Sequence, residues 1–377
     1  MKFLHLADLH IGKSVNGFLM LNEQRRAFEQ VLEYIQAARP DAALVAGDIY
    51  DRAVPGVEAV RLFDDFLTGL AGCDISVLII AGNHDSPERL NYASRLLADK
   101  KIHVCGTADK APRKIILTDE YGDVNFWLMP FVRPDDAAAA LEAAEIDYNS
   151  RNVLAAHQFF TKPGAAAPFR SESELNPVGG LDAVDCAILE RFDYAALGHL
   201  HRAQKIGAEH IRYAGSPVKY SFSEWRHEKS FTVVELKEKG DLTITAVLIE
   251  PIRDMREIRG ALEELIGGKN IDENKNKDKE DYLRVILTDE EEIIDPMGKI
   301  RSVYPNVMSL DFENSRTRAE ADIPGITADA EQTGQMLPYD LFSEFFLDIS
   351  GAVMSAEQSE IIKDILIKTG TEAAEES

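Results

Sequence analysis

The sequence predicts an α/β protein in which two packed β-sheets are flanked by helices, with a small α+β domain and a pair of helices in its C-terminal third. Short apolar runs alternate with amphipathic stretches at the start of the chain, and a longer series of β-like segments follows. A charged low-complexity run and a polar, acidic stretch then interrupt the pattern. The length of 377 residues is enough for two or three domains, and 45% hydrophobic residues exclude a wholly disordered chain.

The first two thirds of the chain predict the sheets and their covering helices. Strands are expected in KFLHLAD, AALVAGD and SVLIIAGN, because each is a short apolar run bounded by turn residues. Between them, residues 19–38 and 57–71 have apolar side chains at three- and four-residue spacing, which predicts amphipathic helices. Further β-like segments are VNFWLMPF, NVLAAHQ, DYAALGH, HIRYAGS, SFTVVEL and LTITAVLIE. This strand content predicts a second sheet packed on the first.

The last third predicts smaller units. We expect a helix at 255–267, an exposed charged linker at 269–281, strands in YLRVILT and NVMSLDF, and a short helix around PMGKIRSV. Two helical patterns follow at 339–351 and 355–370, and Ser355 with Gln358 forms a capping box at the start of the second. The predicted domains are therefore 1–252, 253–315, a linker at 316–337 and C-terminal helices at 338–370. The apolar faces of these helices would dock either on their own domain or on another protein.

Charge and cysteine content exclude several classes of protein. The formal net charge is −24, which argues against a chain that binds nucleic acid on its own through charge alone. Cys73, Cys105 and Cys186 are widely spaced, so neither a disulfide framework nor a cysteine metal site is indicated, and the reducing cytoplasm is the expected compartment. We expect no secretory signal and no membrane span, because no apolar stretch is long enough.

Five short polar segments follow β-like runs: ADLHIG, AGDIYD, AGNHDSP, AAHQ and GHLH. Singly, each has a structural explanation, since an Asp or Asn at a strand end commonly caps a turn and a buried His is commonly a core residue. Together they bring imidazole, carboxylate and amide groups to strand ends, and residues two apart in a strand face the same side. These donors suit Mn, Fe or Zn, and they are too many for one tetrahedral ion. The sequence therefore predicts two ions that share a carboxylate, with Asp48 as the bridge.

These segments resemble the calcineurin-like metallophosphoesterase superfamily, whose pattern runs DxH, GDxxD, GNHD, a single His and GHxH. Within it, DLHIG, GNHDSPERL and YAGSPVKYSFSE are similar to the bacterial SbcD branch of double-strand-break-repair nucleases. The resemblance covers nearly the whole chain, because the α+β unit and the last helices fall where that family has its capping domain and its partner-binding helices. It implies the calcineurin-like fold of two packed sheets flanked by helices.

The resemblance also implies the roles of individual residues. One divalent metal ion would be held by Asp8, His10, Asp48 and His201, and a second by Asp48, Asn83, His157 and His199. Mn²⁺ is the family expectation for both ions. His84 would donate a proton to the leaving 3′ oxygen, with Asp85 as its orienting partner.

The implied activity is hydrolysis of phosphodiester bonds in DNA during repair and recombination. The family acts as a 3′–5′ exonuclease on duplex DNA and as an endonuclease on single strands and hairpins. Its expected partners are DNA and an SMC-like ATPase, SbcC, which regulates it with ATP and would bind the C-terminal helices. A homodimer within a heterotetramer is implied, and its interface either includes the helical segments 57–71 and 89–98 or leaves them as core.

Two other functions remain open at this point. A phosphatase or cyclic-nucleotide phosphodiesterase could use the same metal ligands, and an adaptor could keep the fold without catalysis. Residues 253–377 favour the nuclease, because a hydrolase of small substrates does not need them. The complete ligand set argues against the adaptor.

Overall fold

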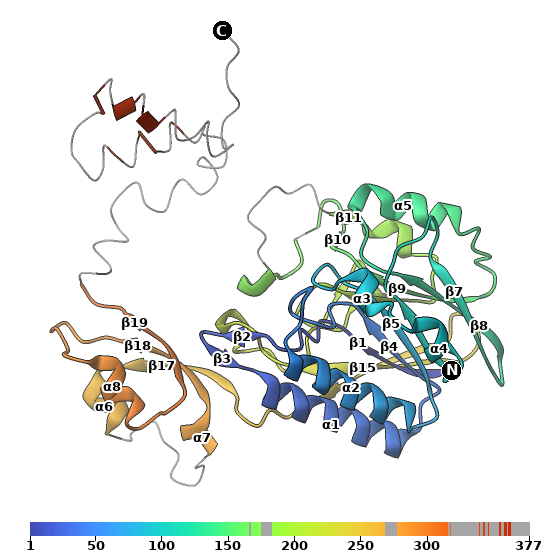
Figure 1. Ribbon diagram of the computed structural model, residues 1–377. Helices are drawn as coiled ribbons and strands as arrows, with labels where there is room; N and C mark the ends of the chain where they lie inside the picture. Colours follow the sequence, from blue (N-terminus) through green and yellow to red (C-terminus); the bar gives the residue numbers. More distant parts are fainter. Residues whose placement is uncertain are drawn as a thin grey trace. The chain divides into compact units, whose positions relative to one another are not determined.

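The structure is a computed structural model that describes residues 1–165, 167–174, 183–267, 277–315 and 317, with single residues and pairs between 339 and 362. It divides into two compact units. The first contains Met1–Ile286 and Ile294–Asp311, and the second contains Leu287–Ile293 and Phe312–Ser377. Most residues of the second unit lie outside the described part, so the fold below is that of the first unit (Figure 1).

The first sheet carries the N-terminal strand in its interior. Its order is β16-β15-β1-β4-β5-β6, and the strands β1, β4, β5 and β6 run parallel while β15 and β16 are antiparallel neighbours. The bounds are β1 (Lys2–Leu6), β4 (Ala42–Ala46), β5 (Ser76–Ile80), β6 (Ile102–Cys105), β15 (Ser230–Leu236) and β16 (Leu242–Leu248). Every residue of β4 is buried, as expected of a strand covered on both faces. The strands predicted in this part of the sequence are confirmed.

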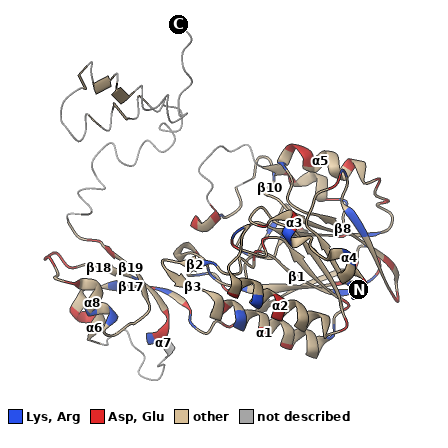
Figure 2. Cartoon of the chain, viewed as in Figure 1, with Lys and Arg blue, Asp and Glu red and all other residues tan. Residues whose placement is uncertain are grey.

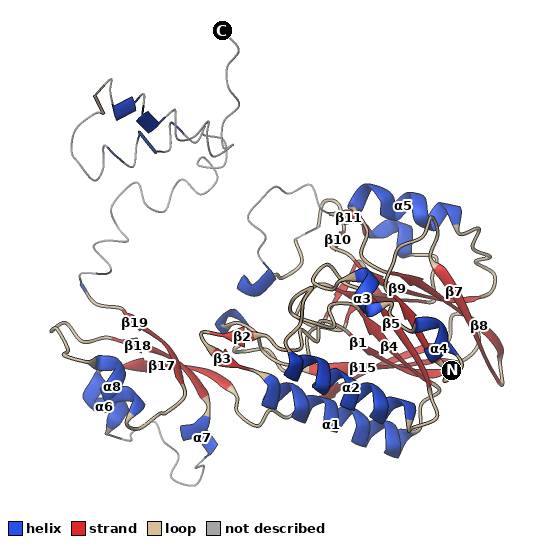
Figure 3. Cartoon of the chain, viewed as in Figure 1, coloured by secondary structure: helices blue, strands red, loops and turns tan. Residues whose placement is uncertain are grey.

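Helices cover the outer face of this sheet. Helix α1 (Leu21–Ala38) and helix α2 (Val57–Ala71) lie side by side, and the Phe28 and Phe66 rings stack with centroids 4.5 Å apart (Figure 3). Their buried residues recur at three- and four-residue spacing, which confirms the amphipathic pattern. Two short helices, α3 (Pro87–Leu90) and α4 (Ser94–Ala98), follow β5.

The predicted second sheet is present, with the order β13-β14-β12-β9-β8-β7. Its strands are β7 (Arg113–Asp119), β8 (Gly122–Met129), β9 (Arg151–His157), β12 (Tyr194–Gly198), β13 (Gln204–Ile206) and β14 (Ala208–Tyr213), and helix α5 (Pro134–Ala143) packs on its outer side. Between the sheets, the Phe3 ring of β1 lies 5.3 Å from Phe126 of β8 and 5.8 Å from Tyr194 of β12. One apolar core therefore joins the two sheets.

Shorter elements complete this part of the fold. They are the two-residue strands β2 (Ser14–Val15), β3 (Phe18–Leu19), β10 (Phe160–Thr161) and β11 (Val184–Asp185), and the 3₁₀ turns η1 (Glu172–Glu174), η2 (Cys186–Leu189) and η3 (Phe222–Glu224).

A three-stranded sheet of order β17-β18-β19 follows, with strands β17 (Met255–Gly260), β18 (Tyr282–Leu287) and β19 (Val307–Phe312) and helices α6 (Leu262–Ile266), α7 (Lys277–Glu280) and α8 (Pro296–Arg301). The two predicted strands and the helix at PMGKIRSV are confirmed. The helix predicted at 255–267 is confirmed only at 262–266, where α6 lies, because residues 255–260 form a strand. Cross-strand ion pairs of Arg256 with Asp281 at 2.7 Å and of Glu257 with Arg284 at 3.6 Å favour pairing there.

The predicted linker at 316–337 and most of the two C-terminal helical patterns lie outside the described residues. The capping box is confirmed, since the Ser355 amide donates to Gln358 Oε1 at 2.9 Å and the Gln358 amide donates to Ser355 Oγ at 3.3 Å. Within the described part of the chain, no helix has the length and apolarity needed to cross a membrane. The domain limits remain predictions.

The packing between the sheets leads to a stability prediction. Phe126→Ala should lower the free energy of unfolding by about 3–5 kcal/mol, because it removes a fully buried ring that contacts the opposite sheet. Urea unfolding measures this change. As a control, Ile116→Ala on β7, where the side chain is 52% exposed, should change stability by no more than about 0.5 kcal/mol. Equal losses in the two variants would contradict the described core.

Candidate metal centre

The five polar segments meet at one edge of the paired sheets, where β1, β4, β5, β9 and β12 end. Backbone hydrogen bonds hold the segments together. The Asp8 amide donates to the Gly47 carbonyl at 3.1 Å, and the His10 amide donates to the Asp48 carbonyl at 2.9 Å. The His199 amide of the second sheet donates to Asp8 Oδ1 at 2.8 Å, which links the two sheets at the site.

Left-handed backbone conformations mark this cluster. The φ angles are 53° at Asp8, 40° at His10, 51° at Asp48 and 111° at His199, a region that residues other than glycine rarely occupy. These residues lie beyond the strand ends. The expectation that ligands two residues apart face the same side of a strand is therefore wrong. A turned backbone directs their side chains toward the site, and such strain concentrates at functional positions.

Glycines in the same segments allow close approach. A Cβ atom at Gly82 would overlap the Asp48 carboxylate, and one at Gly198 would overlap the Ala46 carbonyl and the His157 ring. Gly82 and Gly198 are therefore required, because any side chain at either position would collide with a neighbouring segment.

Three of the predicted ligands, His10, His201 and Asp48, form the first half of the cluster, and Asp8 lies near Asp48 and His157. The Nε2 atoms of His10 and His201 lie 3.0 Å apart, and His10 Nε2 lies 3.4 Å from Asp48 Oδ2. Asp8 is fully buried, and its Oδ2 atom has no hydrogen-bond partner among the described residues. A buried carboxylate oxygen without a donor is costly unless a cation binds it, so this half fits a metal ion.

The second half forms around the other side of Asp48. His157 Nε2 lies 3.4 Å from Asp48 Oδ2 and 3.1 Å from Asn83 Oδ1, and His199 Nδ1 lies 3.3 Å from the same Asn83 oxygen. The Nδ1 atom of His157 lies 2.8 Å from the Ala46 carbonyl, which fixes the ring with Nε2 toward the site. Asp48 Oδ2 is therefore placed between two groups of nitrogen and oxygen donors, as a bridging ligand requires.

The buried carboxyl groups of the cluster require positive charge beside them. Burial raises the pKa of Asp8 to about 7 and lowers the pKa of His199 to about 3. Burial opposes ionisation of Asp48 and His157 as well, but their mutual attraction keeps the pKa of Asp48 below its usual range and raises that of His157 to about 9. The two buried carboxyl groups can therefore ionise together only beside cationic groups, a requirement that divalent ions satisfy.

His84 lies at the edge of this cluster, on the side of His10. Its backbone amide donates to Asp48 Oδ1 at 2.9 Å, and its ring centroid is 4.7 Å from that of His10. Its Nδ1 atom lies 2.9 Å from the Asp51 carbonyl oxygen, so Nδ1 donates there and Nε2 is left for another partner.

The predicted pairing of His84 with Asp85 is wrong. The Asp85 carboxylate instead accepts hydrogen bonds from the backbone amides of Ile49, Tyr50 and Gly82, at 3.1, 2.9 and 2.9 Å. It joins the loop after β4 to the loop after β5, while the Asp51 carbonyl orients the His84 ring.

The sequence analysis did not identify the polar groups behind His201. Its Nδ1 atom lies 2.9 Å from Ser173 Oγ and 3.3 Å from Glu224 Oε1. Glu224 is fully buried, and its Oε2 atom pairs with Lys229 Nζ at 2.6 Å. Lys229 also donates to the His201 carbonyl at 2.8 Å.

This network orients His201 with Nε2 toward His10, in the way that carboxylates commonly support metal-binding histidines. The composition of SFSEWRHEKS, that of a solvated loop, did not predict it, although Glu224 ends the segment YAGSPVKYSFSE that carries the family resemblance.

Comparisons with known proteins show which family the chain is similar to. The model of the calcineurin-like phosphoesterase family matches residues 1–203, and a model described as Type 5 capsule protein repressor C-terminal domain matches residues 251–348. A relative from Staphylococcus epidermidis, named as the SbcD component of the nuclease SbcCD, is 30% identical over 388 residues, which cover 97% of this chain and 98% of that protein. A protein of the same name from Staphylococcus saprophyticus is 29% identical over 391 residues, with the same coverage.

Among solved structures, a dimetal phosphatase from Danio rerio superposes with a TM-score of 0.40 at 11% identity, over 67% of this chain and 99% of that one.

The bridging position of Asp48 leads to a prediction of metal content. The wild-type chain should retain two divalent ions, Asp48→Ala should retain neither, and His199→Ala should lose one, because only Asp48 lies between both groups. Native mass spectrometry after exposure to Mn²⁺ counts the ions. His103→Ala, which changes a histidine outside the cluster, is the matched control. Two ions retained by Asp48→Ala would refute the arrangement.

The support behind His201 leads to a second prediction. Glu224→Gln keeps the shape of the side chain but removes its charge, and it should weaken Mn²⁺ binding by about 10- to 100-fold. Isothermal titration calorimetry measures the affinity, and thermal melting of the metal-free protein reports any loss of folding. The exposed Glu228 provides the control variant Glu228→Gln. Unchanged affinity in Glu224→Gln would exclude the supporting role.

Proposed function

This chain belongs to the calcineurin-like phosphoesterase family, and from that premise we propose that it is a metal-dependent nuclease that hydrolyses phosphodiester bonds in DNA. The observation that carries the proposal is the convergence of nitrogen and oxygen donors on both sides of Asp48. The full-length match to proteins named as the SbcD component of the nuclease SbcCD supports DNA as the substrate. The match at 251–348 favours a nuclease over a phosphodiesterase of small molecules, which would not need that region.

The predicted ligands divide between the two sides of Asp48. Asp8, His10 and His201 would bind one ion with Asp48, and Asn83, His157 and His199 would bind the other. Two divalent ions held in this way supply Lewis-acid activation of the phosphate and of the attacking water, and they offset the charge of the transition state. We infer that Mn²⁺ is the preferred ion.

His84 would act as the general acid. Because its Nδ1 atom donates to the Asp51 carbonyl, Nε2 can hold the proton that the leaving 3′ oxygen needs. The contact of its amide with Asp48 Oδ1 keeps the ring beside the metal ligands. Asp85 supports this position indirectly by joining the two loops.

Each of the two relatives is named as one component of the SbcCD nuclease. This name supports the proposal that this chain also has a partner protein. We propose that this partner is an SbcC-type, SMC-like ATPase that regulates the nuclease with ATP in DNA repair and recombination. The helices expected at 338–370 would bind it, and two copies of the nuclease chain would pair within a heterotetramer in the cytoplasm. Exonuclease activity on duplex ends and endonuclease activity on single strands and hairpins are the expected reactions.

The role of His84 can be tested directly. His84→Ala should reduce Mn²⁺-dependent cleavage of linear duplex DNA by roughly 100- to 10,000-fold, the contribution of a general acid, while the chain still binds both ions. Gel analysis of a labelled duplex and metal counting by mass spectrometry give the two readouts. His103→Ala should cut DNA like the wild type. Hydrolysis of a chromogenic bis-phosphodiester without cleavage of DNA by the wild type, even with the ATPase partner, would contradict the nuclease assignment.

A further inference from the structure

Three arginines beside the metal centre each stack on an aromatic ring. The guanidinium carbon of Arg170 lies 4.6 Å from the centroid of Phe159, that of Arg202 lies 5.2 Å from Phe169, and that of Arg226 lies 4.5 Å from Trp225. The rings also form contacts with histidines, since Phe159 lies 6.1 Å from His199 and Phe169 lies 4.9 Å from His227. We call Phe159, Phe169, Arg170, Arg202, Trp225 and Arg226 the arginine-aromatic surface.

This surface begins at the predicted metal ligands. Phe159 packs against His199, and Arg202 directly follows His201 in the chain. His201 and Arg202 line a cavity of about 450 Å³ together with Arg226, His227 and Lys229. Glu228 is the one carboxylate among the residues that line it. A substrate that enters the metal centre from this side therefore meets a cationic wall.

The arginines of this surface lack carboxylate partners within the described part of the chain. Elsewhere the arrangement is different: on helices α1 and α2, where basic and acidic residues are interspersed (Figure 2), Arg25 pairs with Asp65, Arg26 with Glu33 and Arg61 with Glu58. The chain as a whole has a net charge of −24, and beside the metal centre three arginines without carboxylate partners in the described residues lie over aromatic rings. Their charge is available to an external anion.

Two buried polar atoms at this surface also lack partners. Neither Arg170 Nε nor His227 Nδ1 has a hydrogen-bond partner among the described residues. Burial, together with Lys229 and Arg202, lowers the pKa of His227 to about 4, so its ring is neutral; because Lys229 is paired with Glu224, the positive charge of this surface comes from the arginines. Unsatisfied polar atoms beside these guanidinium groups are consistent with a site that is completed by a ligand.

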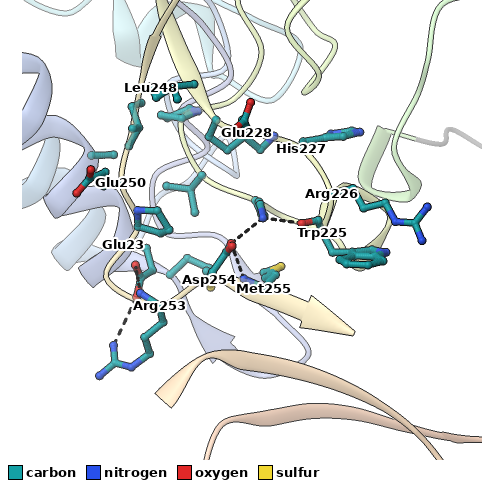
Figure 4. Close-up of a pocket in the computed structure, with 18 residues that line it drawn as sticks. Glu23, Trp225, Arg226, His227, Glu228, Leu248, Glu250, Arg253, Asp254 and Met255 are labelled. Carbon is teal, nitrogen blue, oxygen red and sulfur yellow. Dashed lines mark hydrogen bonds and ion pairs between the residues drawn. The ribbon is translucent and has the colours of Figure 1, made fainter. Parts of the chain in front are cut away.

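A neighbouring pocket shows the contrast. It has a volume of about 380 Å³ and shares Trp225 and Arg226 with the arginine-aromatic surface, but on its other side two ion pairs neutralise charge within the protein, since Lys219 pairs with Asp254 at 2.6 Å and Glu23 pairs with Arg253 at 3.4 Å. Figure 4 shows the Arg226 side chain beside the Trp225 ring, directed away from Glu23 and Arg253. Arg226 lines this pocket as well, but its guanidinium lies over the Trp225 ring and has no ion pair with a carboxylate among the described residues.

We infer that the arginine-aromatic surface binds an unpaired nucleic-acid strand next to the metal centre, with bases stacked on the aromatic and guanidinium planes and phosphates bound by the arginines. This inference rests on the proposed nuclease function and identifies the residues that hold its substrate. Stacked aromatic and arginine groups bind unpaired bases irrespective of their sequence, whereas bases inside a duplex do not expose their faces. A single strand is thus the form of DNA that this chemistry fits.

The test is fluorescence anisotropy of a labelled oligothymidylate with the full-length chain in Ca²⁺, over a series of salt concentrations. The double variant Arg202→Ala/Arg226→Ala should bind the strand about tenfold or more weakly, and each lost phosphate contact should lower the slope of log affinity against log salt by about 0.7. Phe169→Leu should also weaken binding several-fold, but with an unchanged slope, because it removes stacking and no charge. The control Arg26→Ala changes a half-buried, paired arginine on helix α1 and should bind like the wild type.

Cleavage assays separate this inference from the function on which it rests. With Mn²⁺, the double variant should lose at least about ten times more activity on single-stranded DNA than on a chromogenic bis-phosphodiester, which has no strand to stack. If the wild type cuts DNA but the variants bind and cut the strand as it does, this surface is not the strand site and the inference is overturned. If the wild type hydrolyses the small diester and no DNA, the proposed function itself fails. Equal losses of binding to oligothymidylate and to polyglutamate in every variant would indicate an acidic protein partner and also overturn the inference.

Discussion

The carboxylate of Asp48 is the interaction on which the rest of the site depends. Its Oδ2 atom lies 3.4 Å from a nitrogen of His10 and 3.4 Å from a nitrogen of His157, so it joins ligands that come from the two opposed sheets. Its Oδ1 atom accepts the amide of His84 and thereby fixes the proposed acid. A buried carboxylate is stable only where hydrogen-bond donors or positive charge offset the loss of water. The same carboxylate therefore joins the ligands of the two sheets and creates the need for cations between them.

Much of this could be predicted from the sequence. Most strands of both sheets and helix α2 follow from apolar runs and periodicity, whereas β6, β7 and β13 were not predicted; the ligand types follow from polar residues at strand ends. The details depended on contacts between distant segments. The strand at 255–260 forms because Arg256 and Glu257 find partners on or beside β18, and the direction of Asp8 and His10 follows from a left-handed backbone that no periodicity reveals.

Buried charges were the least predictable part. Glu224 and Lys229 occupy a segment whose composition is that of a surface loop, yet they form a buried pair behind His201. Asp85 was expected to orient His84, but it binds three backbone amides, and a main-chain carbonyl orients the ring. Net charge was also a coarse guide. An overall charge of −24 argued against binding of nucleic acid, whereas arginines stacked on rings next to His199 and His201 provide a local cationic surface.

The most direct test of the account is anomalous diffraction at the manganese edge from crystals of the full chain soaked in Mn²⁺. Two peaks about 3.5–4 Å apart, one on each side of Asp48 Oδ2, are expected from a carboxylate that bridges two ions. A single peak, or two peaks of which neither contacts Asp48, would contradict the central role of this carboxylate and the two-metal mechanism built on it.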